Sequence, residues 1–165
     1  FQVHLSWYQN QYLILFFPDT WGFELFEAEV PFKINPWSKS RKFYATDYED
    51  FFGRKNYVEE TSGGFYACKL PVLEKLRELR KQGAVLALRF ITSEDRFPLG
   101  VFVCREATRI SLGNKINLEF DSKESLLNYA RAKIIKEFNT DINLLLKQSK
   151  LLNRKSQQKR LSSFI

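Results

Sequence analysis

The sequence predicts an α+β fold, in which a mixed or antiparallel sheet packs with two main helices and a flexible basic C-terminal tail follows. Apolar or alternating stretches of strand length occur both in series and separated by stretches of helical period. Aromatic residues make up 16% of the 165 residues, a fraction typical of a chain with a buried core and not of a disordered one. We therefore expect one globular domain over residues 1–148 and a tail over residues 149–165.

The first thirty residues predict strands. Residues 3–8 alternate between apolar and polar side chains, as in a strand with one buried face. Residues 12–17 are apolar throughout, which is typical of a strand buried on both faces. After a break at Pro18, residues 23–30 alternate again and predict a third strand.

Residues 31–64 show no clean period and interleave aromatic residues with cations, prolines and glycines. A connection of this length inside a compact domain is usually functional or contains short elements of its own. Its aromatic side chains could stack on unpaired bases, although we expect most of them to lie in the core.

The middle of the chain changes to a helical period. Residues 67–82 predict a helix, and Gly83 is well placed to end it. Residues 84–91, which are apolar except for Arg89, predict the strongest strand of the chain. Residues 99–104 predict a second central strand, and residues 105–112 predict a short helix. The apolar stripe of the first helix consists of Leu70, Val72, Leu73, Leu76 and Leu79.

The last third of the chain predicts helices on a basic background. Residues 117–120 predict a brief strand, after which Ser122 caps an amphipathic helix with Glu124 in its first turn. Residues 142–146 predict another short helix, and the chain is polar and basic from Ser149 onward.

The net charge of +7 belongs mainly to the C-terminal end. Asp141 is the last acidic residue and six cations follow it, so residues 1–141 carry 20 basic and 19 acidic groups. This balance weakens the case for a DNA-binding body, because phosphate affinity needs clustered cations. The basic arm is compatible with weak, salt-sensitive DNA contact, with steering towards an acidic partner, or with a solubilising tail.

The side chains that most often carry catalysis or bind metals are scarce. Cys68, Cys104 and the single histidine, His4, show neither metal-ligand spacing nor a disulfide framework, and no Ser–His–acid or Cys–His arrangement supports hydrolase chemistry. We expect no cofactor within this chain and cysteines that act as buried apolar side chains in a reducing interior. No apolar run is long enough to span a bilayer, which favours a cytoplasmic, intracellular protein without membrane contact. Because methionine is absent, we expect a fragment of a longer protein or N-terminal processing.

Two groups of cations are candidate phosphate contacts. Arg54 and Lys55 follow Gly53, which permits close backbone approach, although a turn with a solvated cationic face is the favoured alternative. Arg105 and Arg109 are four residues apart and would share a helix face. They could bind a phosphate or, as we favour, take part in an internal ion-pair network with Glu24 or Glu27. The Gly63–Gly64 pair could present N–H groups to an anion, with a tight turn as the favoured alternative.

The last eight residues form a short interaction motif. Leu161, Phe164 and Ile165 can make one apolar plug in a 3₁₀ turn, with Gln158 beside it as a hydrogen-bonding group. An apolar plug on a polar tail indicates a protein partner. The pattern resembles the PCNA-interacting peptide, by which repair proteins dock on the sliding clamp, except that Ile165 replaces a second aromatic residue. The alternative is a mildly sticky terminus.

Several ordered stretches together are similar to one family, and in this order and spacing they resemble the C-terminal half of the archaeal Nre-type (NreA) DNA repair proteins. The stretches are residues 16–18, 21–27, 53–57, 63–74, 84–91, 98–109 and 158–165.

The resemblance implies a role in the response to DNA damage, recruitment to PCNA, possible DNA contact and association with the nucleoid while clamp-bound. It also implies an N-terminal half with zinc-binding character that is absent here, and it supplies no enzymatic activity. Two other hypotheses stay open. One is a nucleic-acid-processing or nucleotide-handling enzyme with an arginine-rich phosphate site, and the other is a DNA-binding module that uses residues 31–66.

Overall fold

One mixed sheet organises the part of the chain that the structure describes. The computed structural model describes residues 1–5, 10–30, 43–92, 100–113 and 118–154. Within these residues six strands lie side by side in the order β4-β3-β5-β2-β1-β6, and only the β3–β5 pair is parallel. The predicted α+β class and mixed sheet are confirmed. The strands are β1 (Gln2–Leu5), β2 (Asn10–Phe17), β3 (Gly22–Val30), β4 (Tyr44–Glu49), β5 (Ala84–Thr92) and β6 (Leu118–Glu119).

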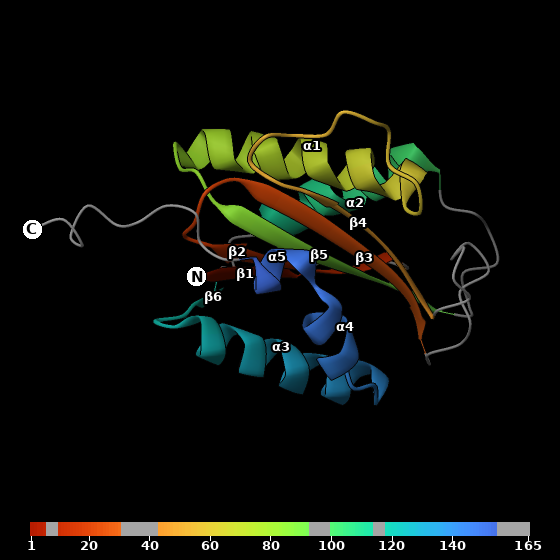
Figure 1. Ribbon diagram of the computed structural model, residues 1–165. Coiled ribbons are helices and arrows are strands. Elements are labelled where there is room, and N and C mark those ends of the chain that lie inside the picture. Colours follow the sequence, from red (N-terminus) through yellow and green to blue (C-terminus); the bar gives the residue numbers. More distant parts are fainter. Residues whose placement is uncertain (6–9, 31–42, 93–99, 114–117, 155–165) are drawn as a thin grey trace, which may run out of the picture.

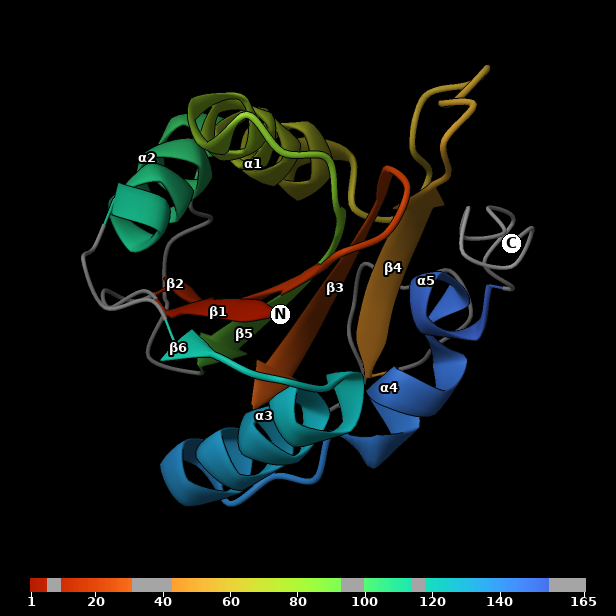
Figure 2. The same ribbon diagram turned by 90° about the vertical axis from the view of Figure 1, so that its left-hand side faces the viewer.

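Helices cover both faces of this sheet. Two of them, α1 and α2, pack side by side on one face, while α3, α4 and α5 lie against the other (Figures 1 and 2). None of the described helices is long and apolar enough to cross a membrane. The helices are α1 (Ser62–Leu79), α2 (Val101–Gly113), α3 (Lys123–Phe138), α4 (Asn143–Gln148) and α5 (Lys150–Asn153).

Strand β2 is apolar from Tyr12 to Phe17 because both of its faces are buried. Leu13, Leu15 and Phe17 face α3, α4 and α5 and belong to one core. Ile14 and Phe16 point the other way, into a second core beneath α1 and α2. Because successive side chains of a strand point to opposite faces, a strand covered on both sides must be apolar at every position.

The strand predicted over residues 99–104 is wrong, because residues 101–104 form the first turn of helix α2, while residue 99 lies outside the described residues. The helix predicted over residues 105–112 is confirmed as the remainder of α2. In α2 the apolar side chains of Val101 and Phe102 are exposed, whereas Cys104 is buried. The buried stripe has helical spacing and is made mostly of small residues, which let α2 pack closely against the sheet and α1. Its members are Cys104, Ala107, Thr108, Ser111 and Leu112.

The start of α3 is capped as predicted, whereas the end of α1 is not where the sequence predicted it. Ser122 caps α3 as predicted, by accepting a hydrogen bond from the backbone N–H of Ser125. Helix α1 ends earlier than predicted, at Arg80 and not at Gly83, because Arg80 adopts the left-handed conformation and its N–H and that of Lys81 return to helix carbonyls. Strand β4 was not predicted, since it is a short edge strand inside an aperiodic segment.

The packed body extends beyond the predicted boundary at residue 148. Buried Glu24 of β3 accepts hydrogen bonds from Ser149 Oγ at 2.5 Å and from the backbone N–H groups of Lys150 and Leu151 at 3.0 Å. Arg154 donates to the carbonyls of Thr20 and Trp21. Residues 149–154 are therefore held on the sheet, and the predicted flexible tail from residue 155 onward lies outside the described residues.

Glu24→Ala is expected to release this segment and to lower the free energy of unfolding by about 2 kcal/mol, because it removes three hydrogen bonds at a buried site. Trypsin should then cleave faster after Lys147 and Lys150.

Burial raises the pKa of Glu24 above its ordinary value of 4.5, although the hydrogen bonds from Ser149, Leu151 and Lys150 act in the opposite direction. The contribution of Glu24 is thus fully present below pH 4.5 and declines as pH rises through the raised pKa. A loss that grew with pH would contradict this assignment.

Candidate functional site

Three connections meet at one end of the sheet. Gly22 at the start of β3 pairs with Ala84 at the start of β5, and Phe23 pairs with Glu49 at the end of β4. The turn over residues 18–21, the loop over residues 50–57 and the connection over residues 80–83 consequently leave the sheet together. This end therefore combines residues that lie far apart in the sequence.

Trp21 is held rigidly at this end. Its indole Nε1 donates a hydrogen bond to Glu49 Oε1 at 3.1 Å, and its ring stacks parallel to that of Phe23 with centroids 6.3 Å apart. Glu49 also binds Lys69 Nζ at 2.6 Å, and that ammonium group lies 6.0 Å from the centroid of the Trp21 ring. A fixed aromatic side chain loses little conformational entropy when a ligand packs on it.

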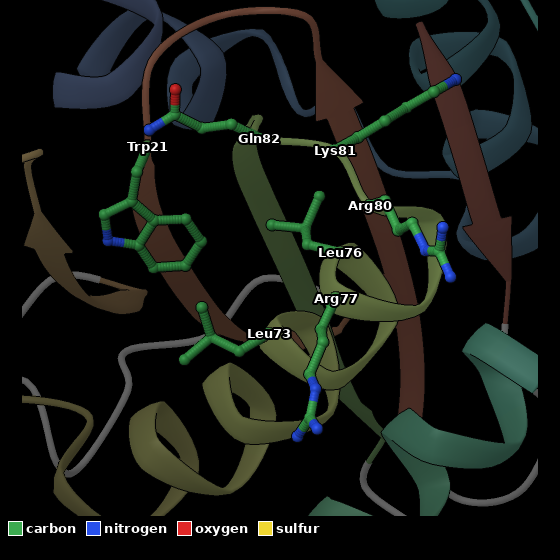
Figure 3. A pocket seen from close by; sticks show the side chains of 7 residues that line it. All are labelled: Trp21, Leu73, Leu76, Arg77, Arg80, Lys81 and Gln82. Atoms are coloured by element: carbon green, nitrogen blue, oxygen red, sulfur yellow. The ribbon is translucent and has the colours of Figure 1, made fainter.

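A cavity of about 570 Å³ lies between Trp21 and the C-terminal end of α1, and we call it the Trp21 groove. Figure 3 shows the indole on one side, with Leu73 and Leu76 facing it, while the charged ends of the cationic side chains extend away from this apolar centre. The groove is lined by Trp21, Leu73, Leu76, Arg77, Arg80, Lys81 and Gln82.

The cations of the groove are available to a ligand. Arg77, Arg80 and Lys81 are exposed, and within the described residues their side chains make no hydrogen bond or ion pair. The acids of the same helix are engaged elsewhere, since Glu74 binds Arg109 and Glu78 binds Lys75. Uncompensated positive charge therefore borders an apolar floor.

Sequence reasoning did not identify the Trp21 groove. Arg77, Arg80 and Lys81 were visible as cations off the apolar stripe of a helix, where a solvated face is the ordinary explanation. Their relation to Trp21 depends on the parallel pairing of β3 with β5, which brings residue 22 beside residue 84. No local sequence pattern predicts that β3 pairs with β5.

Arg54 is bound within its own loop. Its guanidinium donates to the carbonyls of Tyr48 at 2.7 Å, Asn56 at 3.2 Å and Tyr57 at 3.3 Å. Lys55 beside it is exposed. The structure therefore gives Arg54 a role in shaping the loop, and phosphate contact by Arg54 and Lys55 stays a prediction.

The same loop displays aromatic side chains to solvent. Phe51, Phe52 and Tyr57 are 56%, 81% and 64% exposed, whereas Tyr44 and Phe65 nearby are buried. Among the described aromatic residues of this region, the prediction that most belong to the core holds for Tyr44 and Phe65 and fails in the loop, while residues 31–42 lie outside the described residues. Exposed aromatic rings are the side chains on which unpaired bases stack.

Arg105 and Arg109 form the internal ion-pair network that the sequence favoured, with different partners. Arg109 binds Glu74 of α1 through two hydrogen bonds, of 2.9 and 2.7 Å, and binds Glu106 at 2.7 Å. Arg105 pairs with Glu106 at 3.2 Å. The hydrogen bond from Arg109 lowers the pKa of Glu74. Phosphate contact by either arginine stays a prediction, and a phosphate would have to compete with these carboxylates.

The glycine pair at the start of α1 approaches an internal carboxylate. Gly63 and Gly64 lie in the first turn, and a Cβ on Gly64 would overlap Oε1 of Glu27. Glu27 also forms an ion pair of 2.6 Å with Arg89. A carboxylate near a helix N-terminus is electrostatically favourable, so Glu27 supplies the anion here.

The cysteines are buried and free of disulfides, as the sequence predicted. Burial raises the pKa of Cys68 to about 12, so its thiol stays protonated near neutral pH and is a poor nucleophile. Among the described residues no cluster of His, Cys, Asp or Glu could hold a metal ion. The side chain of His4 and the motif residues Gln158, Leu161, Phe164 and Ile165 lie outside what the structure describes.

Comparison with known proteins identifies relatives. A model of the family described as "Archaeal Nre, C-terminal" matches residues 49–164. Proteins named "DNA repair protein NreA" are 36% identical over 101 residues in Haloferax volcanii and 34% identical over 125 residues in Archaeoglobus fulgidus, covering 61% and 76% of this chain. "DNA repair protein NreB" of Archaeoglobus fulgidus is 31% identical over 151 residues, or 91% of this chain. The aligned regions span 24%, 31% and 37% of these relatives' lengths, and no solved structure matches.

Proposed function

The chain belongs to the archaeal Nre family, and from this membership we propose that it is a domain of a DNA repair protein that responds to DNA damage. The observation that carries the proposal is the family match over residues 49–164, together with relatives that are named DNA repair proteins. A protein with this role acts inside the cell and contacts DNA.

The proposal includes recruitment to the PCNA sliding clamp through the C-terminal motif. Gln158 enters a polar pocket of the clamp, and Leu161, Phe164 and Ile165 fill a hydrophobic one. Micromolar affinity, about −8 kcal/mol, is expected because a tail that becomes ordered on binding loses conformational entropy. While clamp-bound, the protein is associated with the nucleoid.

Residues 149–154 are bound to the sheet, so only a short tether joins the domain to the C-terminal motif. Arg154 is fixed by its bonds to Thr20 and Trp21 and by an ion pair of 3.2 Å with Asp19. Gln158 follows four residues later, a distance of at most about 14 Å for an extended chain. A clamp bound through the motif would therefore sit close to the end of the sheet that carries Trp21.

The double variant L161A/F164A is expected to weaken binding to the cognate clamp at least about hundredfold, because it removes most of the apolar plug. Isothermal titration calorimetry of the wild type and variant measures this change. The matched control S162A/S163A alters the same stretch without touching the plug and should bind like the wild type. Thermal unfolding of both variants should be unchanged. Equal clamp affinity of L161A/F164A and wild type would rule out recruitment by this motif.

Within the part of the chain that the structure describes, the candidate arginines do not form a phosphate site. Arg54, Arg105 and Arg109 were the basis of an arginine-rich phosphate site, and each of their guanidinium groups is engaged by carboxylates or carbonyls. The enzyme hypothesis therefore has no specific observation in its favour.

A further inference from the structure

We infer that the Trp21 groove binds single-stranded DNA, with one unpaired base against Trp21, Leu73 and Leu76. The flanking phosphates then meet Arg77, Arg80 and Lys81. The inference rests on the proposed function in taking DNA as the ligand, and it names the form of DNA and the site.

The floor of the groove suits a base. The cavity of about 570 Å³ lies within the range of sites that hold ligands of nucleotide size. Trp21 offers a π surface that is already fixed by Glu49 and Phe23, and stacking on such a surface tolerates every base. Leu73 and Leu76 close the opposite side with apolar surface. In a duplex the bases are stacked on one another, so only an unpaired base can enter.

The rim of the groove suits phosphates. Arg77, Arg80 and Lys81 are exposed and point their charged ends outward from the apolar centre (Figure 3). This is the arrangement that a strand requires when its base is buried and its backbone stays at the surface. The end of α1 thus carries clustered cations in a body whose overall charge is close to neutral, and the fold places them beside Trp21.

The position of the groove agrees with delivery from the clamp. Arg154 donates to the backbone carbonyl of Trp21 at 3.0 Å, so the last described residue before the motif is bound to the end of the sheet that carries Trp21. A sliding clamp encloses DNA, and a body tethered this closely would hold the groove near that DNA.

Fluorescence anisotropy of the full chain with a labelled single strand of about 12 nucleotides tests the inference. The variant R77Q/R80Q/K81Q should lose at least about tenfold in affinity at moderate salt. Its slope of log affinity against log salt should fall by about 2, since each cation contributes about 0.7 on single strands. The matched control K136Q/K147Q/K150Q removes three exposed cations from α3, α4 and α5, on the opposite face of the sheet, and should change affinity less than about twofold.

A second pair of variants separates stacking from charge. Trp21→Leu should lose about tenfold in affinity with an unchanged salt slope, whereas Trp21→Phe should retain most of the affinity. If Trp21→Leu does not fold, the triple cation variant decides alone. Equal affinity of R77Q/R80Q/K81Q and K136Q/K147Q/K150Q for the single strand would overturn the inference. Preference of the wild type for duplex DNA over the single strand would also overturn it.

Clamp titration keeps the two proposals distinguishable. R77Q/R80Q/K81Q should bind the clamp like the wild type, and L161A/F164A should bind the single strand like the wild type. If the groove variant binds the single strand like its control while clamp binding is intact, only the groove proposal is contradicted. If the wild type does not bind the clamp, only the recruitment proposal is contradicted, and the groove is judged by the DNA experiment.

Discussion

Replacing Glu27 with alanine is expected to lower the free energy of unfolding by about 3–5 kcal/mol, the largest effect of any substitution considered. The Glu27 Oε1–Arg89 Nη1 distance is 2.6 Å, and the two side chains are 14% and 9% exposed. Without Glu27 the charge of Arg89 stays in the core without its carboxylate partner, and the desolvation cost is no longer offset. Urea denaturation monitored by circular dichroism measures the loss.

Two further variants show whether the ion pair is the cause. Glu29→Ala changes the same residue type on the same face of the same strand, at a position that is also partly buried but has no ion pair within the described residues, and it should cost less than about 1 kcal/mol. Glu27→Leu combined with Arg89→Met should recover most of the loss, because apolar side chains of similar volume often replace a buried ion pair without penalty. A double variant as unstable as Glu27→Ala would show that shape at this site matters more than charge.

Replacing Asp47 with alanine is expected to cost about 3 kcal/mol. The buried carboxylate accepts hydrogen bonds from the backbone N–H groups of Glu59 at 3.1 Å, Glu60 at 2.9 Å and Thr61 at 2.7 Å, and from Thr61 Oγ1 at 2.9 Å. The side chain of Thr61 does not cap α1, so Asp47 of β4 holds the start of this helix from across the fold. Hydrogen bonds to a charged acceptor are among the stronger ones.

Hydrogen exchange should locate the effect of Asp47→Ala. The amides of Glu59, Glu60 and Thr61 are expected to exchange faster in this variant, alongside the shift in the urea midpoint. Asp50→Ala removes a solvent-exposed carboxylate that binds one backbone amide, that of Phe52, and it should cost less than about 1 kcal/mol. Unchanged exchange at residues 59–61 in Asp47→Ala would mean that other contacts hold this segment.

The period of apolar residues in the sequence predicted the strands and helices that bury the same face or faces along their whole length. Strands β2 and β5 are covered on both faces and are mostly apolar along their length, while α3 has a clear apolar stripe and a serine cap. Periodicity predicted the helix over residues 105–112 but failed for the first turn of α2, where the apolar residues 101–103 resemble a continuation of a strand. It also failed for β4, which is held by pairing with β3 and by Asp47. Edge pairing and helix–helix packing are interactions between distant segments, so a local window does not contain them.

The sequence by itself determined the α+β class, the family resemblance and the terminal motif, because each depends on residues that are neighbours in the chain. Only the tertiary structure decided which cations are already paired. Arg109 meets Glu74 across 35 residues and Arg89 meets Glu27 across 62, whereas Arg77, Arg80 and Lys81 end beside Trp21 with no such partner in the described chain. Charge compensation acts over a few ångströms in space, and the fold alone sets those distances.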